Sequence, residues 1–360
     1  MFISALLHAP TLCCLFGSSP SHSPKSSKRK NFSMASSVRI AVVGDVHDDW
    51  NLQEDTKALQ LLRPDLVLFT GDFGNENVEL VQSIADLEFA KAVILGNHDA
   101  WSTQQFSERR KDRVQLQLEC LGEEHVGYRR LDFPMLKLSI VGGRPFSCGG
   151  EQLFRKRLLA ARYGVHDMNG SAKRVYEAAL GTPEDHLVIF LAHNGPTGLG
   201  SNLNDICGKD WVFGGGDHGD PDLAHAICHL KETTQFSIPL VVFGHMHKEL
   251  AYGNGLRKMI VLGADNTIYL NGAIVPRVKR LGDEQGTNNR GFMNNETPVT
   301  TPEAEGTVRA FTLVEIVDGK LEKIAETWVS VIGDKTTLEE EHILFSTGPR
   351  GAELSLGNSV

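Results

Sequence analysis

The sequence predicts an α/β fold with two β-sheets. Short apolar runs rich in β-branched residues recur along the 360 residues, and segments with helical spacing separate the first three runs. Such an alternation of strands and helices implies a parallel sheet with helical crossovers. After Gly244 the pattern changes to strands joined by short turns, which indicates a meander that forms a second sheet.

The expected elements follow one another along the chain. Buried strands are expected in the apolar runs 39–43, 66–70, 92–95, 136–141, 187–192 and 240–243. Helices are expected at 51–62, 78–87, 101–121, 152–162, 172–180 and 222–233. The strands of the meander are expected at 258–262, 267–271, 308–315 and 321–328.

These elements predict one domain over residues 38–333. The segment 281–306 is rich in Asn, Gly, Thr and Glu and has almost no apolar residues, so we expect a disordered loop inserted between two strands. Residues 334–360 are expected to form a C-terminal tail with a short apolar patch.

The N-terminal segment 1–37 resembles an organelle address. It has no acidic residue, is rich in serine and contains the basic cluster Lys28-Arg29-Lys30. Transit peptides have this composition, and the serine content favours the plastid stroma over the mitochondrion. A plain disordered tail or a nuclear signal are the alternatives, and an internal start at Met34 would give a cytosolic form.

Composition excludes several classes of protein. The formal net charge of −9 argues against broad binding to nucleic acids or to anionic membranes. No uninterrupted apolar run after the N-terminal segment reaches the ~20 residues of a membrane helix. Six cysteines without a CxxC pair argue against a thiolate zinc site and against a disulfide framework. Oligomeric state cannot be read from the sequence.

Five apolar runs end in Asp, Asn or His, often beside glycine. The endings are Gly44-Asp45-Val46-His47, Gly71-Asp72, Gly96-Asn97-His98-Asp99, His193 and Gly244-His245-Met246-His247. Open α/β sheets bind ligands at the carboxyl ends of their strands, so we expect these side chains to converge. Turn chemistry explains Asp, Asn and Gly at such places, but it does not require so many histidines.

The donors in these endings suit metal ions. The set is Asp45, His47, Asp72, Asn97, His193, His245 and His247. Oxygen and imidazole donors without thiolate favour Mn²⁺, with iron or Zn²⁺ as alternatives. Seven donors are too many for one ion, and if Asp72 bridges through both oxygens they divide into two sites of four. A metal pair about 3.5–4 Å apart is the clamp used in phosphoryl transfer.

In this order and at these strand ends, the motifs resemble the calcineurin-like metallophosphoesterase superfamily. The resemblance implies a four-layer sandwich of two packed mixed β-sheets flanked by helices. It also implies one ion bound by Asp45, His47, Asp72 and His247. A second ion would be bound by Asp72, Asn97, His193 and His245. By the same resemblance, His98 would protonate the leaving group, and Asp99 would hold the imidazole of His98 in orientation.

Two branches of the superfamily fit the sequence poorly. Protein Ser/Thr phosphatases continue their GD motif with Asp-Arg-Gly, whereas this chain has Phe73-Gly74-Asn75-Glu76. Purple acid phosphatases have a metal-binding tyrosine shortly after GD, near the place where Asn75 stands. Asn75 and Arg144 are candidates for substrate binding. Trp101 is expected to pack in the core, with stacking on a base or ring as the alternative.

The sequence therefore predicts a metal-dependent phosphoesterase that acts on a phosphomonoester or phosphodiester of a small molecule or nucleotide. Two cations would lower the pKa of a bridging water and so supply hydroxide as the nucleophile. A general acid such as His98 typically contributes about 10²–10⁴-fold. A nuclease acting on nucleic-acid ends and a non-catalytic metal-binding scaffold are the alternatives.

Overall fold

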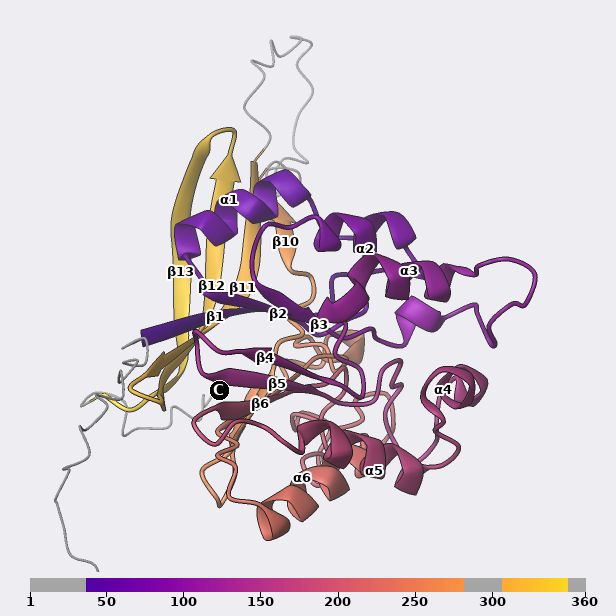
Figure 1. Cartoon of the computed structure of the whole chain (residues 1–360). Coiled ribbons are helices and arrows are strands. Elements are labelled where there is room, and N and C mark those ends of the chain that lie inside the picture. The colour runs from indigo at the N-terminus through magenta and orange to yellow at the C-terminus, as the bar shows by residue number, and fades with distance from the viewer. Residues whose placement is uncertain (1–36, 282–305, 349–360) are drawn as a thin grey trace, which may run out of the picture. The chain divides into compact units, whose positions relative to one another are not determined.

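Two β-sheets pack against each other, and helices cover their outer faces (Figure 1). This arrangement is seen in the computed structural model of the chain, which describes residues 37–281 and 306–348. It confirms the prediction of an α/β fold with two packed mixed sheets flanked by helices.

The first sheet combines strands from both ends of the described chain. Its order is β13-β12-β11-β1-β2-β3, and β10 also pairs with β11. The bounds are β1 Ser37–Val43, β2 Leu66–Phe69, β3 Lys91–Val93, β10 Val278–Arg280, β11 Gly306–Val317, β12 Lys320–Ile332 and β13 Lys335–Ser346. β1, β2 and β3 are parallel, whereas β11 runs antiparallel to β1, with Ile40 opposite Leu66 on one side and Val314 on the other.

The second sheet has the order β4-β5-β6-β7-β9-β8. The bounds are β4 Arg130–Phe133, β5 Leu138–Gly142, β6 Leu187–Leu191, β7 Leu240–Phe243, β8 Ile260–Leu262 and β9 Ile268–Asn271. Its four middle strands are parallel, and β4 and β8 are antiparallel edge strands.

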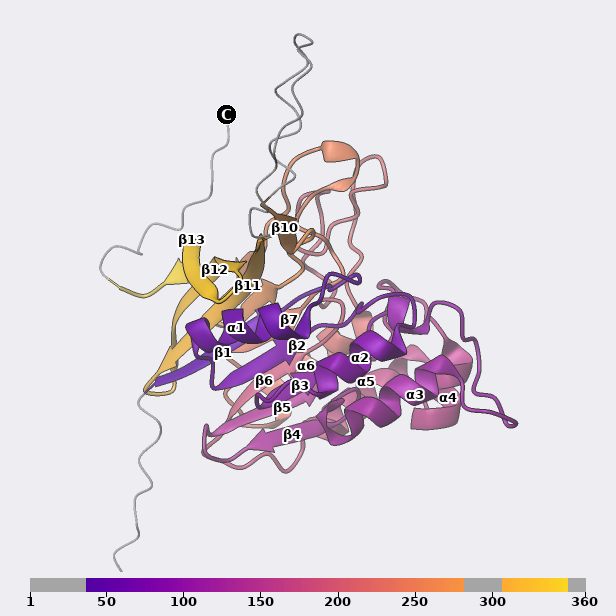
Figure 2. The ribbon, with the colours of Figure 1, turned by 90° about the horizontal axis from the view of Figure 1, so that it is seen from above.

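Helices lie outside the two sheets. The α-helices are α1 Leu52–Leu62, α2 Val78–Ala85, α3 Arg113–Leu121, α4 Lys156–Tyr163, α5 Met168–Ala179 and α6 Pro221–Thr233. Short 3-10 helices cover His98–Ala100, Gly122–Glu124 and Ala251–Gly253. The view from above shows α1 and α2 over the strands of the first sheet (Figure 2), and α5 and α6 lie on the side of the second sheet (Figure 1).

The period-two alternation of a strand accounts for this layering. In β1, Ile40 and Val42 belong to the apolar cluster between the sheets, while Ala41 and Val43 pack in the cluster that includes the helices. Because both faces of these central strands are covered, their sequences are apolar throughout. Polar side chains that could form a functional site can therefore lie only where these strands end.

The C-terminal strands differ from the sequence prediction. The strands after Gly244 do not form a second sheet of their own: β8 and β9 join β4–β7, while β10–β13 extend the first sheet. Residues 335–346, assigned to a tail, form β13 instead. This edge strand was missed because its run of Glu339, Glu340 and Glu341 has no apolar face in the sequence.

The helix expected at 101–121 is much shorter than predicted. It begins only at Arg113, because the Asp112 side chain accepts a hydrogen bond from the backbone N–H of Gln115 and caps the helix. The preceding residues form a loop that is held in part by Glu76, which accepts the backbone N–H groups of Ser102 and Thr103.

Three of the sequence predictions concern segments outside the described residues. These are the address segment, of which only Ser37 is described, most of the inserted loop at 281–306, and the last part of the predicted tail from residue 349 onward. Among the helices that the structure does describe, none combines the length and apolar character needed to cross a membrane.

Candidate metal centre

The turns after β1, β2, β3, β6 and β7 bring the predicted donor residues together. The first three strands belong to one sheet and the last two to the other, so the centre is built where the carboxyl ends of both sheets meet. Groups of donor atoms within 4.8 Å of one another are formed by Asp45, His47 and His247 and by Asp72, His193 and His245. Asn97 joins the second group through a 2.9 Å contact between its Oδ1 and His193 Nε2.

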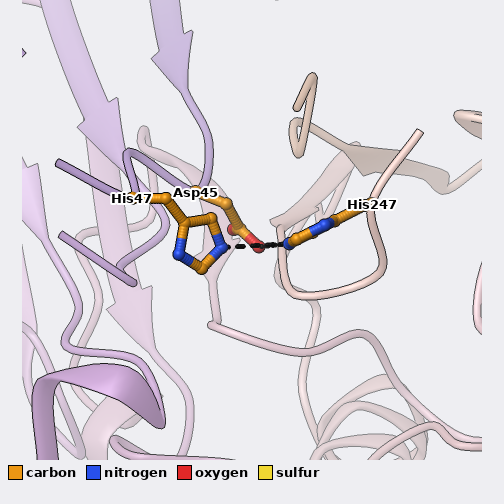
Figure 3. A group of neighbouring side chains, drawn as sticks. All are labelled: Asp45, His47 and His247. Carbon is orange, nitrogen blue, oxygen red and sulfur yellow. Dashed lines mark hydrogen bonds and ion pairs between the residues drawn. The ribbon is translucent and has the colours of Figure 1, made fainter. Parts of the chain in front are cut away.

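The first group consists of Asp45, His47 and His247 (Figure 3). The Nε2 atoms of the two histidines lie 3.0 Å apart, and His247 Nε2 lies 3.5 Å from Asp45 Oδ2. Asp45 is 1% exposed, and its Oδ2 has no hydrogen-bond partner among the described residues. A buried carboxylate oxygen without a donor is costly unless a cation binds it, so these residues fit a metal ion.

Asp72 lies between the two groups. Its Oδ1 is 3.4 Å from His193 Nε2, and its Oδ2 is 4.0 Å from His47 Nε2. The two oxygens thus face different histidines, which is the placement that a bridging carboxylate requires. Oδ1 also accepts the backbone N–H of His98 at 2.9 Å.

His193 is oriented by the backbone. Its Nδ1 lies 2.7 Å from the carbonyl oxygen of Thr70, which can only accept, so Nδ1 carries the proton and donates. The lone pair of a neutral ring then sits on Nε2, which faces Asp72 and Asn97. A second hydrogen bond that fixes the tautomer of a ligand histidine in this way is typical of metal sites.

The backbone at the centre takes conformations that ordinary residues avoid. His47, Asp72 and His245 have φ of 44°, 51° and 67°, in the left-handed region. A Cβ on Gly96 would lie 2.3 Å from Asp72 Oδ1, and one on Gly244 would lie 2.2 Å from Asp45 Oδ1. Glycine is required at these two places because the ligand side chains occupy the space beside them.

The electrostatics of the centre keep its two carboxylates ionised. Burial raises the pKa of Asp45 and Asp72, but contact with His247 for Asp45, and the charge of His193 for Asp72, lower both pKa values below normal. Burial lowers the pKa of His193, but the Asp72 carboxylate outweighs it and raises that pKa to about 10. Burial and the charge of His193 lower the pKa of His245 to about 3. The carboxylates therefore present negative charge to whatever binds between the histidines.

His98 lies at the edge of the first group. Its Nδ1 is 2.7 Å from Asn75 Oδ1, and its ring meets the His47 ring edge-on at a centroid distance of 5.0 Å. The Trp101 indole stacks on the imidazole, with centroids 4.8 Å apart and planes 9° from parallel. Asn75, a predicted substrate-binding residue, is thus a hydrogen-bond partner of His98.

The role predicted for Asp99 is corrected by the structure. Its carboxylate does not hold the His98 ring but accepts the backbone N–H groups of Asp72, Phe73 and Gly96 at 2.9, 2.9 and 2.7 Å. Asp99 therefore ties the turn after β2 to the turn after β3. Its burial and the charge of Asp72 raise its pKa well above normal.

Arg144 does not fit its predicted role in substrate binding either. It is 1% exposed, and its guanidinium pairs with Asp220 at 2.7 Å and with Asp222 at 3.0 Å. Two buried carboxylates already neutralise this charge, so Arg144 holds the start of α6 rather than a phosphate.

Sequence reasoning gave no role to two neighbours of the centre. The Thr70 carbonyl orients His193, and a backbone group leaves no trace in residue identity. His218 stacks on His245 at a centroid distance of 5.8 Å and 27° between planes. His218 lies in a glycine-rich loop distant from the motifs in sequence, and only the fold places it beside the proposed ligand His245.

Comparisons with known proteins identify the family of the chain. Residues 38–249 match the family model described as calcineurin-like phosphoesterase. No curated protein sequence matches the chain.

Two solved structures are similar at low identity. One is a dimetal phosphatase from Danio rerio, at 10% identity and a TM-score of 0.37, covering 85% of this chain and 98% of that one. The other is a predicted phosphoesterase from Streptococcus pneumoniae TIGR4, at 13% identity and a TM-score of 0.31, covering 86% and 99%. Both TM-scores are low, so neither similarity adds to what the sequence match shows.

Proposed function

This chain belongs to the calcineurin-like phosphoesterase family, and from that premise we propose that it uses two metal ions to hydrolyse a phosphate ester of a small molecule or nucleotide. Phosphoester hydrolysis is the activity of the family. Both monoesters and diesters are substrates compatible with a two-metal centre.

We assign the metal ligands from the two groups of donors. One ion would be held by Asp45, His47, Asp72 and His247, and the other by Asp72, Asn97, His193 and His245. The observation that carries this assignment is the position of Asp72, whose two oxygens face histidines of different groups. The unpartnered Oδ2 of buried Asp45 supports it. Oxygen and imidazole donors favour Mn²⁺, with iron or Zn²⁺ as alternatives.

The protein groups around the ions have separate tasks in this proposal. When bound, two cations lower the pKa of water toward neutrality and screen charge on phosphoryl oxygens. His98 donates a proton to the leaving oxygen from Nε2, because its Nδ1 is engaged by Asn75. Asp99 keeps the Asp72 and Gly96 turns at a fixed separation. The proposed metal ligands and His98 therefore keep their positions relative to one another.

A nuclease acting on nucleic-acid ends would need the same core. The net charge of −9 works against it, because binding to a phosphate backbone depends on Lys and Arg. A non-catalytic scaffold would bind metal without turnover.

The test combines metal content with hydrolysis. Purified protein loaded with Mn²⁺ is expected to contain two ions per chain and to hydrolyse p-nitrophenyl phosphate or its bis-aryl diester. Asp72→Ala is expected to lose both properties. Asp48→Asn is the matched control, because Asp48 is an exposed carboxylate next to His47 that bonds to Asn77 instead of facing the donors. Two bound ions without hydrolysis of any ester would favour the scaffold.

A further inference from the structure

Trp101 is a large apolar side chain that the fold does not bury. It follows the 3-10 turn His98–Ala100, and the residue is 48% exposed. One part of the indole is covered by the parallel imidazole of His98 at a centroid distance of 4.8 Å. The rest is open beside the group that we propose as the general acid, although core packing was the expectation from the sequence.

The backbone holds this indole in place. The Trp101 N–H donates to the His98 carbonyl at 3.2 Å. Arg155 Nε donates to the Ala100 carbonyl at 2.6 Å, and Arg155 Nη2 donates to the carbonyl of Trp101. Phe154 adds a ring contact at a centroid distance of 6.2 Å. Trp101 is therefore a fixed surface, since both its main chain and one side of its ring are held.

The position of this surface follows from the role of His98. A general acid lies within hydrogen-bond reach of the leaving oxygen. The group attached to that oxygen must therefore begin beside His98 and lie along the residues that surround His98. The exposed part of Trp101 is an apolar surface that adjoins His98.

We propose that Trp101 forms a leaving-group subsite that accepts a planar aromatic ring, such as a nucleobase or an aryl group. This inference rests on the proposed function, and specifically on His98 as the acid. Indoles stack on the flat faces of bases and aryl rings, and every such ring offers that face. Trp101 would thus select substrates by the ring on the leaving group, while the metal centre acts on the phosphate.

Pairs of substrates with the same kind of leaving alcohol test the subsite. Adenosine 5′-phosphate is compared with ribose 5-phosphate, and benzyl phosphate with ethyl phosphate, so that the arms separate a nucleobase from a simple aryl ring. The wild type is expected to prefer the ring-bearing member of at least one pair about tenfold or more in kcat/KM. The preference should lie mainly in KM, because stacking is the same in the ground state and the transition state.

Three variants show whether Trp101 causes the preference. Trp101→Leu is expected to abolish it, and Trp101→Phe to keep part of it. Phe213→Leu is the matched control, because Phe213 is a fully exposed aromatic residue on the loop before α6. A role limited to holding His98 would lower kcat for both members of each pair alike, and that result would overturn the proposal.

Fluorescence gives a readout that does not depend on turnover. Adenosine or benzyl alcohol is expected to quench tryptophan emission of the wild type and of Phe213→Leu, and not of Trp101→Phe. Equal kcat/KM within both pairs, together with turnover of p-nitrophenyl phosphate, would overturn the subsite and leave the proposed function intact. Absence of turnover with every ester would overturn both.

Discussion

The two groups of proposed ligands lie at different depths. In the group of Asp45, His47 and His247, the histidine side chains are 25% and 40% exposed. In the group of Asp72, His193, His245 and Asn97, three side chains are 0–3% exposed, and only His245 is partly exposed. We call these the outer and the inner site. The comparison indicates that an ion at the inner site would be more deeply buried, because only one of its two histidines is partly exposed, while both histidines of the outer site are.

His98, the proposed acid, also lies on the outer side. His98 meets the ring of His47, and its other neighbours are Asn75 and the exposed Trp101. A leaving group must depart into solvent, so an acid on the open side fits the chemistry.

Removing the shared carboxylate should abolish both sites. Asp72→Ala is expected to lower the rate by more than about ten-thousandfold, because each metal ion supplies several kcal/mol of transition-state stabilisation. Metal analysis should find fewer than two ions per chain, and p-nitrophenyl phosphate hydrolysis measures the rate. A variant that keeps two ions would show that Asp72 is not shared. Circular dichroism of the variant and of Asp48→Asn controls for unfolding.

Replacing His98, the proposed acid, should slow hydrolysis without changing metal binding. His98→Ala is expected to slow hydrolysis of alkyl phosphates by about a hundred- to thousandfold, within the range of general acids. An aryl phosphate with a good leaving group needs less protonation, so its rate should fall much less. Both ions should remain bound. An equal loss with both leaving groups would contradict the role of His98.

Chelation should remove the two ions in sequence. The outer ion is expected to leave first, so a chelator time course followed by metal analysis should pass through a form with one ion per chain. His247→Ala should eliminate the fast phase and weaken the outer site at least 10–100-fold, the usual effect of losing even an outer-shell partner. His193→Ala should instead affect the slow phase. Release of both ions at one rate would show that the two depths are equivalent.

The smallest effect is expected at Asn75. Asn75→Ala removes one hydrogen bond to His98, and a net contribution of about 1 kcal/mol corresponds to roughly a fivefold loss in rate. The loss should be confined to substrates that also depend on His98, with metal content unchanged. Steady-state rates on the alkyl and aryl esters measure it. A drop in bound metal would place Asn75 in the metal site instead.

Much of the centre could be predicted because it is built at strand ends. Buried parallel strands are apolar throughout, so a polar residue at the end of one stands out in the sequence. His193 could be found in this way although nothing else marks it. The parallel strands could be predicted for the same reason. The helix α6 could also be predicted, and it begins one residue before its expected start.

The wrong predictions have a common cause, which is that long-range contacts cannot be seen in the sequence. The residue type and position of Asp99 and Arg144 predict functional roles, but both residues are buried and contact groups that are mostly distant in sequence. Sequence does not show that Asp99 accepts N–H groups from another turn, nor that Asp220 and Asp222 neutralise Arg144. The burial of the two proposed sites could not be predicted either, because it depends on how the two sheets pack against each other.

The pairing of β1 with β11 has a consequence for synthesis. The strand that ends in Asp45 and His47 is completed by residues 312–317, as Ile40 lies opposite Val314. All seven donors leave the ribosome well before those residues do, and one edge of β1 stays open until they arrive. We expect the nascent chain to hold its metals only after residues 312–317 have been added, so termination between residues 248 and 311 would yield a protein with all seven donors and no assembled centre.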